Sequence, residues 1–338
     1  KAQVAAIDAV AKLTPAKAPE NLHIGLVAIR PGTGEVIALY GGKDYLVRQL
    51  NDATQSIALA GSTFKPFALA GALEAGIPLT SMWNGDTPQV FDDAGKPYEV
   101  NNYGDEGWGQ IDLLTATAHS DNTVYVPLGI KVGPDKVVDV ARRAGIPDSV
   151  AMMPTPSVVL GAASPHVIDV ASAYATFAAQ GVYAQPWFIV EVKGANGGLL
   201  YQANPPTPQE VFSKDVMADL TYGLQEVVKN GTATYGTAGL GRPAAGKTGT
   251  SEQNASAWFS GYLPQLAASV SMFRDDASQT LNGIGGLNSV TGGTFPAKIW
   301  TAFMKGALEG QPKLSFPKPV HIGGTDPVVM TSGGKQSI

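Results

Sequence analysis

The sequence predicts a mixed α/β fold in which a central antiparallel sheet packs with helices beside a mostly helical subdomain. Strand-like runs gather near the two ends of the 338-residue chain, and helix-like segments fill the middle. Early and late strands arranged in this way favour one shared sheet. Hydrophobic residues make up 44% of the chain, which is enough for a large core.

Helices are predicted where apolar residues recur with helical spacing between turn residues. In residues 2–13, for example, Val4, Ile7 and Ala11 fall on one stripe. Gly76-Ile77-Pro78 supplies a clear helix end. The predicted helices cover residues 2–13, 68–75, 111–119, 124–130, 165–179, 216–228 and 294–307.

Strands are predicted by short β-rich runs next to turn sequences. The turns at residues 31–34 and 196–198 indicate two hairpins, and the last three runs are close enough for an antiparallel meander. The predicted strands cover residues 24–29, 35–40, 187–192, 199–202, 244–251, 257–262 and 266–273.

In two stretches the apolar residues show neither helical nor strand-like periodicity. Residues 50–59 are expected to be an irregular approach to the helix that follows. Residues 81–109 are rich in Gly, Asp, Asn and Pro and are expected to form a long surface loop. Trp83, Tyr103 and Trp108 within it either line a substrate groove or cap the core, and general burial tendencies favour the core.

Composition divides the chain into three parts. We expect an N-terminal linker helix over residues 1–21, one main domain over residues 22–308, and a mobile Pro/Gly-rich tail over residues 309–338. No apolar run approaches the roughly 18 residues of a membrane span, and no signal peptide is visible. Because the first residue is Lys1 rather than Met, we expect a fragment or processed form of a longer protein.

Charge and composition exclude several classes of function. A net charge of −5 gives no electrostatic footprint for nucleic acid. The chain has no cysteine, which excludes disulfides and thiol catalysis. The four histidines show no close pairing and no HExxH motif occurs, so we predict no catalytic metal and no cofactor. His119 is expected to be structural, and the missing Gly-x-Ser-x-Gly elbow argues against an α/β-hydrolase.

The stretch from Gly61 to Phe67 places the hydroxyl of Ser62 three residues before the amine of Lys65, where a helix begins. Residues with this spacing share a face in an α turn and in a 3₁₀ turn. Pro66 prefers the first helical position, so both turn types stay open for Ser62. A serine at a helix start also lies beside unpaired backbone N–H groups, where an oxyanion can be held.

Two further motifs follow in order. Ser120-Asp121-Asn122 falls between two predicted helices, and Lys247-Thr248-Gly249-Thr250 falls on the first strand of the meander. S-x-x-K alone proves little, because about one or two matches are expected by chance. Two others, at Ser315–Lys318 and Ser332–Lys335, lie in the tail with no helix to carry them. The ordered set is typical of class A β-lactamases and penicillin-binding proteins.

These residue types suit nucleophilic catalysis by a serine. Ser62 needs a base, and Lys65 can serve only when neutral, which requires its pKa to fall roughly three units from ~10.4. Burial together with a second cation, Lys247, can lower the pKa in this way. Ser120 would relay a proton between Lys65 and the leaving group. Asn122 offers a donor and an acceptor to a substrate amide.

The remaining motif positions suit substrate binding. Lys247 and Thr248 can bind a substrate carboxylate. Gly249 leaves the strand edge bare, so an extended peptide can pair with it. The backbone N–H groups of Ser62 and Thr250 would form an oxyanion hole, which typically contributes ~3 kcal/mol per donor.

Over roughly residues 22–308 the sequence resembles the transpeptidase domain of bifunctional class A penicillin-binding proteins. Beyond the three motifs, the resemblance rests on framework segments that are far more specific than S-x-x-K. These segments are residues 38–45, 103–114, 160–180, 231–232, 242–250, 257–259 and 295–300. The resemblance implies the penicillin-binding and serine β-lactamase-like fold.

The resemblance also implies an activity. Ser62 would be acylated by the D-Ala-D-Ala end of a peptidoglycan stem peptide, and the acyl group would pass to an amine on a neighbouring stem. β-Lactams would trap the same serine. Such proteins act on the extracytoplasmic face of the bacterial membrane, where the parent protein carries an N-terminal tether and a glycosyltransferase domain.

Two features depart from the family pattern, and three alternative functions stay open. Ser256 stands where the family often has Asp, and the strand end at residues 272–276 is unusual. A class A β-lactamase deacylates through a glutamate-held water. Between Asn122 and Lys247 only Glu191, Glu210 and Glu226 occur, none in a Glu-x-x-Leu-Asn context, so we expect slow deacylation. A D,D-carboxypeptidase, a serine β-lactamase and a non-catalytic β-lactam sensor stay as alternatives.

Overall fold

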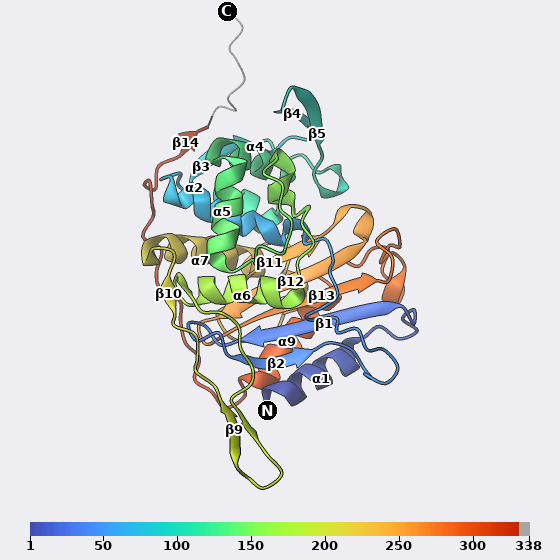
Figure 1. The fold of residues 1–338 in the computed structure, drawn as a ribbon. Helices are drawn as coiled ribbons and strands as arrows, with labels where there is room; N and C mark the ends of the chain where they lie inside the picture. Colours follow the sequence, from blue (N-terminus) through green and yellow to red (C-terminus); the bar gives the residue numbers. More distant parts are fainter. Residues whose placement is uncertain (331–338) are drawn as a thin grey trace, which may run out of the picture.

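The computed structural model describes residues 1–330, and a five-stranded antiparallel sheet forms its centre (Figure 1). The strand order is β11-β12-β13-β1-β2, so strands from the two ends of the chain share one sheet, as the sequence predicted. The strands are β1 (Leu22–Ile29), β2 (Val36–Tyr40), β11 (Ala245–Thr250), β12 (Ser256–Leu263) and β13 (Leu266–Arg274).

Helices cover the sheet on both faces, which is why β12 is buried along its whole length. Helices α1 (Ala2–Leu13) and α9 (Phe295–Ala307) pack together on one face, and α6 (Val167–Ala178) and α7 (Lys214–Lys229) pack on the opposite face. Trp258 and Trp300 are fully buried in this core. Ala6, Ala9 and Val10 of α1 are buried, and the helix packs against α9 and β2. It is therefore part of the packed body.

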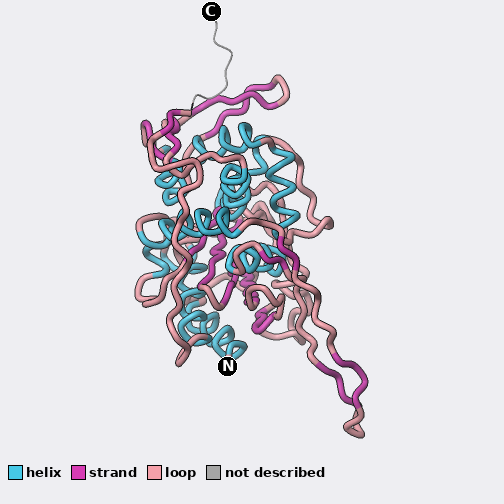
Figure 2. The backbone as a smooth tube through the Cα atoms, turned by 90° about the vertical axis from the view of Figure 1, so that its left-hand side faces the viewer, coloured by secondary structure: helices cyan, strands magenta, loops and turns pink. Residues whose placement is uncertain are grey.

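A mostly helical region lies at one end of the sheet (Figure 2). Its helices are α2 (Lys65–Glu74), α3 (Leu113–His119), α4 (Asn122–Val132) and α5 (Pro134–Ala144). The sequence prediction missed α5, although Gly133 and Gly145 bound it and Pro134 begins it. Short connecting elements are α8 (Thr234–Thr237) and the 3₁₀ helices Gly61–Phe64, Tyr103–Asp105, Pro156–Leu160, Glu252–Asn254 and Ile284–Gly286.

The predicted long surface loop over residues 81–109 was wrong in part. This stretch contains β3 (Ser81–Asn84), β4 (Gln89–Asp93) and β5 (Lys96–Val100), and β3 pairs with β6 (Gln110–Asp112). The strands are short and their connections are rich in Gly and Asp, so their composition resembles a loop.

The three aromatic residues of this stretch have different environments. Trp83 is 3% exposed and caps the core, as burial tendencies favoured. Trp108 stacks on His119 with ring centroids 4.1 Å apart. Tyr103, in contrast, is 63% exposed.

The predicted mobile tail was wrong for residues 310–330. The carboxylate of Asp219 on α7 is buried and accepts the backbone N–H groups of Val320, His321 and Ile322 at 2.7, 3.1 and 2.7 Å. Beyond this contact, β14 (Val328–Val329) pairs in parallel with β3. The tail is therefore held against the body along its length, and residues 331–338 lie outside the described part.

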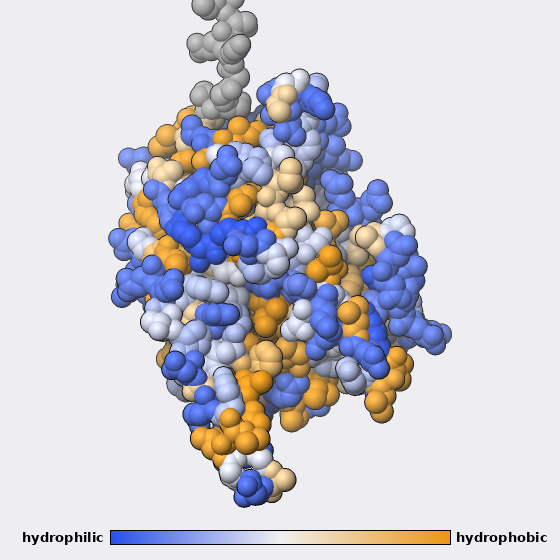
Figure 3. All heavy atoms as spheres, viewed as in Figure 1, coloured by the Kyte–Doolittle hydropathy of each residue, from blue (hydrophilic) through white to orange (hydrophobic). Residues whose placement is uncertain are grey.

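A second hairpin, formed by β8 (Glu191–Lys193) and β9 (Leu199–Gln202), projects from the body. The hairpin was predicted, but its first strand was expected over residues 187–192 and is shorter. Apolar side chains gather near its base in the space-filling view (Figure 3). Strands β7 (Val182–Tyr183) and β10 (Gln209–Glu210) pair beside it. Within residues 1–330, none of the helices combines the length and the apolar character that a membrane span needs.

Candidate active site

Ser62 lies on the 3₁₀ turn Gly61–Phe64, which runs directly into α2 at Lys65. The structure therefore selects 3₁₀ from the two turn types that the sequence left open. The backbone N–H of Lys65 donates to the Ser62 carbonyl, which closes the turn. Ser62 is partly exposed, whereas the Lys65 side chain is fully buried. The hydroxyl is thus accessible and the amine lies in the interior.

The Lys65 amine contacts three oxygens of the Ser-Asp-Asn segment. Its Nζ lies 2.6 Å from Asn122 Oδ1, 3.1 Å from Ser120 Oγ and 2.5 Å from the Ser120 carbonyl. Within residues 1–330, no hydrogen bond joins Ser62 Oγ to Lys65. The two residues lie three positions apart on one turn, and the hydrogen bonds of the Lys65 amine go to the Ser-Asp-Asn segment instead.

Burial explains the acidity of the two lysines. It lowers the pKa of Lys65 to about 7, although the Asp121 carboxylate acts in the opposite direction. Burial also lowers the pKa of Lys247 well below its ordinary value, and the charge of Lys65 adds to this effect. The sequence interpretation gave Lys247 a share in lowering the pKa of Lys65. Burial is the cause at Lys65, and Lys247 is the group on which the like charge acts.

The Ser-Asp-Asn segment lies at a helix junction, as predicted. Ser120 ends α3 in the left-handed conformation, with φ of 62°. Asp121 is the N-cap of α4, and its carboxylate accepts the N–H of Val124 at 2.9 Å and the hydroxyl of Thr123 at 2.8 Å. These caps fix the direction of both neighbours, so Ser120 and Asn122 both face Lys65.

Strand β11 brings the Lys-Thr-Gly motif to the same place. Lys247 is fully buried, and its Nζ lies 2.7 Å from Ser120 Oγ and 3.2 Å from the Thr248 carbonyl. Thr248 Oγ1 lies 2.6 Å from Thr232 Oγ1, a partner that the sequence interpretation did not assign although it included residues 231–232 in the framework. β11 is the edge strand of the main sheet in the described chain.

The backbones that carry the two predicted oxyanion donors lie side by side. Gly61 has φ of +56°, and a Cβ added there would lie 2.8 Å from Thr250 C and 2.9 Å from Thr250 N. A Cβ on Gly249 would lie 2.5 Å from the Ala60 carbonyl oxygen. Only glycine permits this close approach, which keeps Ser62 next to Thr250.

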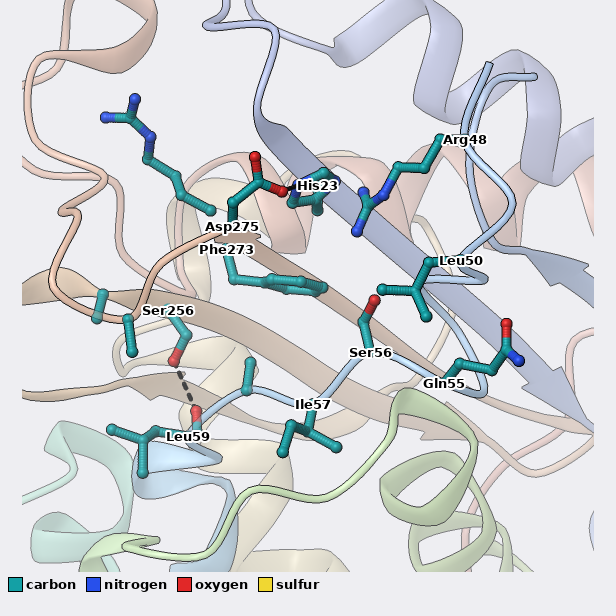
Figure 4. A pocket seen from close by; sticks show the side chains of 14 residues that line it. His23, Arg48, Leu50, Gln55, Ser56, Ile57, Leu59, Ser256, Phe273 and Asp275 are labelled. Carbon is teal, nitrogen blue, oxygen red and sulfur yellow. Dashed lines mark hydrogen bonds and ion pairs between the residues drawn. The ribbon is translucent and has the colours of Figure 1, made fainter. Parts of the chain in front are cut away.

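A separate cavity of about 400 Å³ contains none of the predicted site residues (Figure 4). Ile57 and Leu59 of the approach segment line it on one side, and His23 and Asp275 line it on another. Ser256, which departs from the family pattern, donates to the Leu59 carbonyl at 2.6 Å and so holds the approach to Ser62. Among residues 1–330, no cluster of three or more His, Cys, Asp or Glu side chains is suited to a metal ion.

The structure thus brings Lys65 and Lys247, from segments far apart in the sequence, to Ser120. Sequence reasoning missed Thr232 and the dipeptide Asn101-Asn102. The carbonyl of Asn101 accepts the Asn122 side-chain N–H at 2.8 Å, and the Asn102 side chain bonds the backbone of the Ser-Asp-Asn segment. The only sequence signal for Asn101 and Asn102 was that they lie directly before the framework segment of residues 103–114.

Comparison with known proteins gives consistent matches. Residues 24–280 match the family model for the penicillin binding protein transpeptidase domain. Penicillin-binding protein 1A of Mycolicibacterium smegmatis is 35% identical over 96% of this chain and 42% of that protein. Penicillin-binding protein 2D of Bacillus subtilis is 33% identical over 94% of this chain and 46% of that protein. The chain therefore spans less than half the length of these curated relatives.

Solved structures agree with the sequence matches. The penicillin-binding protein PonA1 from Mycobacterium tuberculosis has a TM-score of 0.86 at 33% identity, covering 97% of this chain and 88% of that one. The PonA1 complex with penicillin V has a TM-score of 0.85 at 34% identity, covering 96% and 88%. The fold, the family match and these relatives all agree, and the chain belongs to the penicillin-binding protein transpeptidase domain family.

Proposed function

We propose that this chain is a serine D,D-transpeptidase that cross-links peptidoglycan stem peptides through an acyl-enzyme on Ser62. The observation that carries the proposal is the buried Lys65 amine, one turn from an accessible serine. Its pKa of about 7 leaves much of it neutral at physiological pH. A neutral amine can accept a proton, so Lys65 is the general base.

Acylation would follow from this arrangement. Lys65 accepts the Ser62 proton while Ser62 Oγ attacks the carbonyl carbon of the penultimate D-Ala. The backbone N–H groups of Ser62 and Thr250 donate to the oxyanion. Collapse of the tetrahedral intermediate breaks the peptide bond and releases the terminal D-Ala, whose amine receives the proton from Lys65 through Ser120. An ester on Ser62 results.

Transfer reverses the proton movements. The acceptor amine attacks the ester carbonyl, loses a proton to Lys65 and forms the new amide, and Ser62 leaves with a proton returned from Lys65. In a β-lactam the leaving nitrogen stays attached to the acyl group, so it continues to occupy the acceptor side. The penicillin V complex of PonA1 supports binding of β-lactams at the corresponding domain.

Substrate binding is assigned to the β11 side of the site. Lys247 and Thr248 would bind the donor carboxylate, and the edge of β11 at Gly249 would pair with the extended peptide. Asn122 would bind a substrate amide. The Asn122 side chain already forms hydrogen bonds with Lys65 and the Asn101 carbonyl. A substrate amide must therefore replace one of these hydrogen bonds or form an additional one.

The cellular setting is also a proposal. We propose a parent protein that is tethered to the bacterial membrane beside a glycosyltransferase domain, with this domain on the extracytoplasmic face. The chain covers only 42% and 46% of two curated relatives, which supports a longer parent. The partners would be a D-Ala-D-Ala donor stem and an amine-bearing acceptor stem. No nucleic acid, metal or cofactor enters the reaction.

Slow hydrolysis of the acyl-enzyme distinguishes this proposal from a β-lactamase. Glu191 and Glu210 are exposed on β8 and β10. Glu226 on α7 accepts from the side chain of Asn230 at 2.6 Å. None of the three contacts Ser62 or Lys65, so no glutamate between Asn122 and Lys247 is in place to activate a deacylating water.

Intact mass after benzylpenicillin treatment tests the nucleophile. The unmutated protein should gain one adduct that persists for many minutes, and Ser62→Ala should gain none. Ser315→Ala, which removes the serine of an S-x-x-K match in the tail, is the matched control and should label normally. An adduct on Ser62→Ala, or turnover of the adduct within seconds, would refute the assignment.

Product analysis then separates the transpeptidase from its alternatives. A stem pentapeptide donor mixed with an amine acceptor should give a cross-linked amide. Hydrolysis alone would indicate a carboxypeptidase, and acylation by penicillin without any peptide product would indicate a sensor.

A further inference from the structure

Asn102 lies outside the three motifs, yet its side chain contacts the Ser-Asp-Asn segment. It is 6% exposed. Its Oδ1 accepts the backbone N–H groups of Asn122 at 2.8 Å and Thr123 at 3.1 Å. Its Nδ2 lies 3.1 Å from both Asp121 Oδ2 and Thr123 Oγ1. One buried amide therefore meets three consecutive residues, Asp121 to Thr123, at the start of α4.

The same amide is anchored on the other side by its own region of the chain. Nδ2 also lies 3.1 Å from the Gly85 carbonyl and 3.0 Å from the Glu106 carbonyl. The backbone N–H of Asn102 donates to Thr87 Oγ1 at 3.1 Å. Asn102 is thus fixed by the strands and turns of residues 81–109, and it transmits that position to the start of α4.

These contacts complete a helix cap. The first N–H groups of an α-helix have no partner within the helix. The Asp121 carboxylate accepts that of Val124, and Asn102 supplies the acceptor for Asn122 and Thr123 from a different part of the chain. The N-terminus of α4, which carries Asn122, therefore depends on Asn102 for its position.

The neighbouring residue sets the orientation of the Asn122 amide. The Asn101 carbonyl accepts Asn122 Nδ2 at 2.8 Å, which leaves Asn122 Oδ1 directed at Lys65 Nζ at 2.6 Å. The reverse orientation would place two N–H donors against the Lys65 amine. Residues 101 and 102 together hold both the backbone and the side chain of Asn122.

We infer that Asn102 is a positioning residue for acylation, which holds the start of α4 so that Asn122 and Asp121 keep their places beside Lys65. The inference rests on the proposed role of Lys65 as the base. Asn102 itself contacts neither Lys65 nor Ser62 in the described chain, so it acts through the Ser-Asp-Asn segment.

The charges around Lys65 give this role a specific signature. The titratable groups that face Lys65 are Asp121 and Tyr125 from the α4 side and Lys247 from β11. Burial raises the pKa of Asp121, and the hydrogen bond from Asn102 is one of the contacts that lower it. A charged Asp121 in turn raises the pKa of Lys65. Loss of Asn102 should therefore lower the pKa of Lys65.

The test compares Asn102→Ala with Asn204→Ala in benzylpenicillin acylation. Asn204 is exposed and has no part in the site, so its variant is the matched control. Asn102→Ala should lower the limiting acylation rate about 10–100-fold with a smaller change in Kd. It should also move the acid limb of the pH–rate profile to lower pH. Asn204→Ala should leave both unchanged.

Asn102→Asp and Asn204→Asp keep the test decisive if the alanine variant does not fold. Aspartate has the shape of asparagine but removes the N–H donors that face Asp121. Asn102→Asp should acylate at least tenfold more slowly than Asn204→Asp at neutral pH. Equal rates for this pair would overturn the inference. So would a lower melting temperature of Asn102→Ala with a normal rate and normal acid limb.

The result is separable from the proposed function. If Ser62→Ala still labels, the nucleophile assignment fails whatever Asn102 does. If Ser62→Ala fails to label and Asn102→Ala acylates normally, only the positioning role fails.

Discussion

Lys247 Nζ lies 2.7 Å from Ser120 Oγ, which joins two segments that are 127 positions apart in the chain. Lys65 Nζ lies 3.1 Å from the same hydroxyl. Ser120 therefore connects two buried amines that both have lowered pKa values. A hydroxyl between two amines can accept a proton from one and donate its own, which is what a relay to the leaving group requires.

The pH dependence of acylation should follow Lys65. With a pKa of about 7, the amine loses its proton in the neutral range, so the second-order acylation constant should rise from pH 5.5 and level off above pH 8. Stopped-flow measurement with a β-lactam that does not titrate in this window tests the expectation. A flat profile would contradict the assignment of Lys65 as the base, and Lys65→Ala should lower the rate about 10²–10⁴-fold.

The same pKa affects stability. The unfolded chain keeps this proton up to about pH 10.4, whereas the folded protein releases it near 7. Between these values the unfolded state binds more protons, so the contribution of Lys65 to the free energy of unfolding should rise with pH. In urea unfolding, the free energy of unfolding should rise more between pH 7 and pH 9 for the unmutated protein than for Lys65→Met. Identical slopes would exclude a lowered pKa.

Gly61→Ala should disrupt the oxyanion hole. The new Cβ would lie 2.8 Å from the Thr250 carbonyl carbon, at a φ of +56° that alanine rarely adopts. We expect the acylation rate to fall at least 100-fold, a loss of about 3 kcal/mol of transition-state stabilisation. Gly76→Ala is the control, because φ is +77° and no atom lies within 4 Å of the added Cβ. It should cost stability without lowering the acylation rate.

Lys247→Ala should mainly weaken substrate binding. The variant removes the proposed carboxylate contact and leaves Lys65 with its bonds to Ser120 and Asn122. The apparent Kd for benzylpenicillin should rise tenfold or more, and the limiting acylation rate should change less. Lys229→Ala, which removes an exposed lysine at the end of α7, is the control for a lost charge. A larger effect of Lys247→Ala on the limiting rate than on Kd would contradict the assignment.

Asp219→Ala should release the tail without affecting catalysis. Its carboxylate accepts three backbone N–H groups of residues 320–322, so we expect a loss of about 2–4 kcal/mol in the free energy of unfolding. Hydrogen exchange at these amides should accelerate, while acylation stays within about twofold. Asp215→Ala, at the exposed start of the same helix, should leave the exchange protection of these amides intact.

Much of the fold could be predicted from the sequence, because strong local patterns decide most of it. The meander of β11, β12 and β13 and the helix over residues 2–13 were predicted almost to the residue. Their signals are period and turn chemistry, which act over a few residues. Helix α5 was overlooked despite its bounding glycines, and short strands in residues 81–109 could not be separated from a loop by composition.

The site could be predicted only as far as its motifs. Lys65, Ser120 and Lys247 come together as the geometric hypothesis required, and Ser62 lies on the turn that leads into Lys65. The burial that lowers the pKa of Lys65 depends on the whole fold, and no local sequence pattern indicates it. Asn102 was missed for a related reason: an asparagine in a polar stretch gives no sign that four acceptors surround it.

The strap formed by residues 310–330 bears on how the protein should be produced in the laboratory. A shortened version that stops at Ala307 would leave the buried Asp219 carboxylate facing solvent without its three donors. It would also bare the edge of β3, where Met330 donates to the Met82 carbonyl at 2.9 Å. The gene fragment chosen for expression should therefore run at least through Met330, even though the family match ends at residue 280.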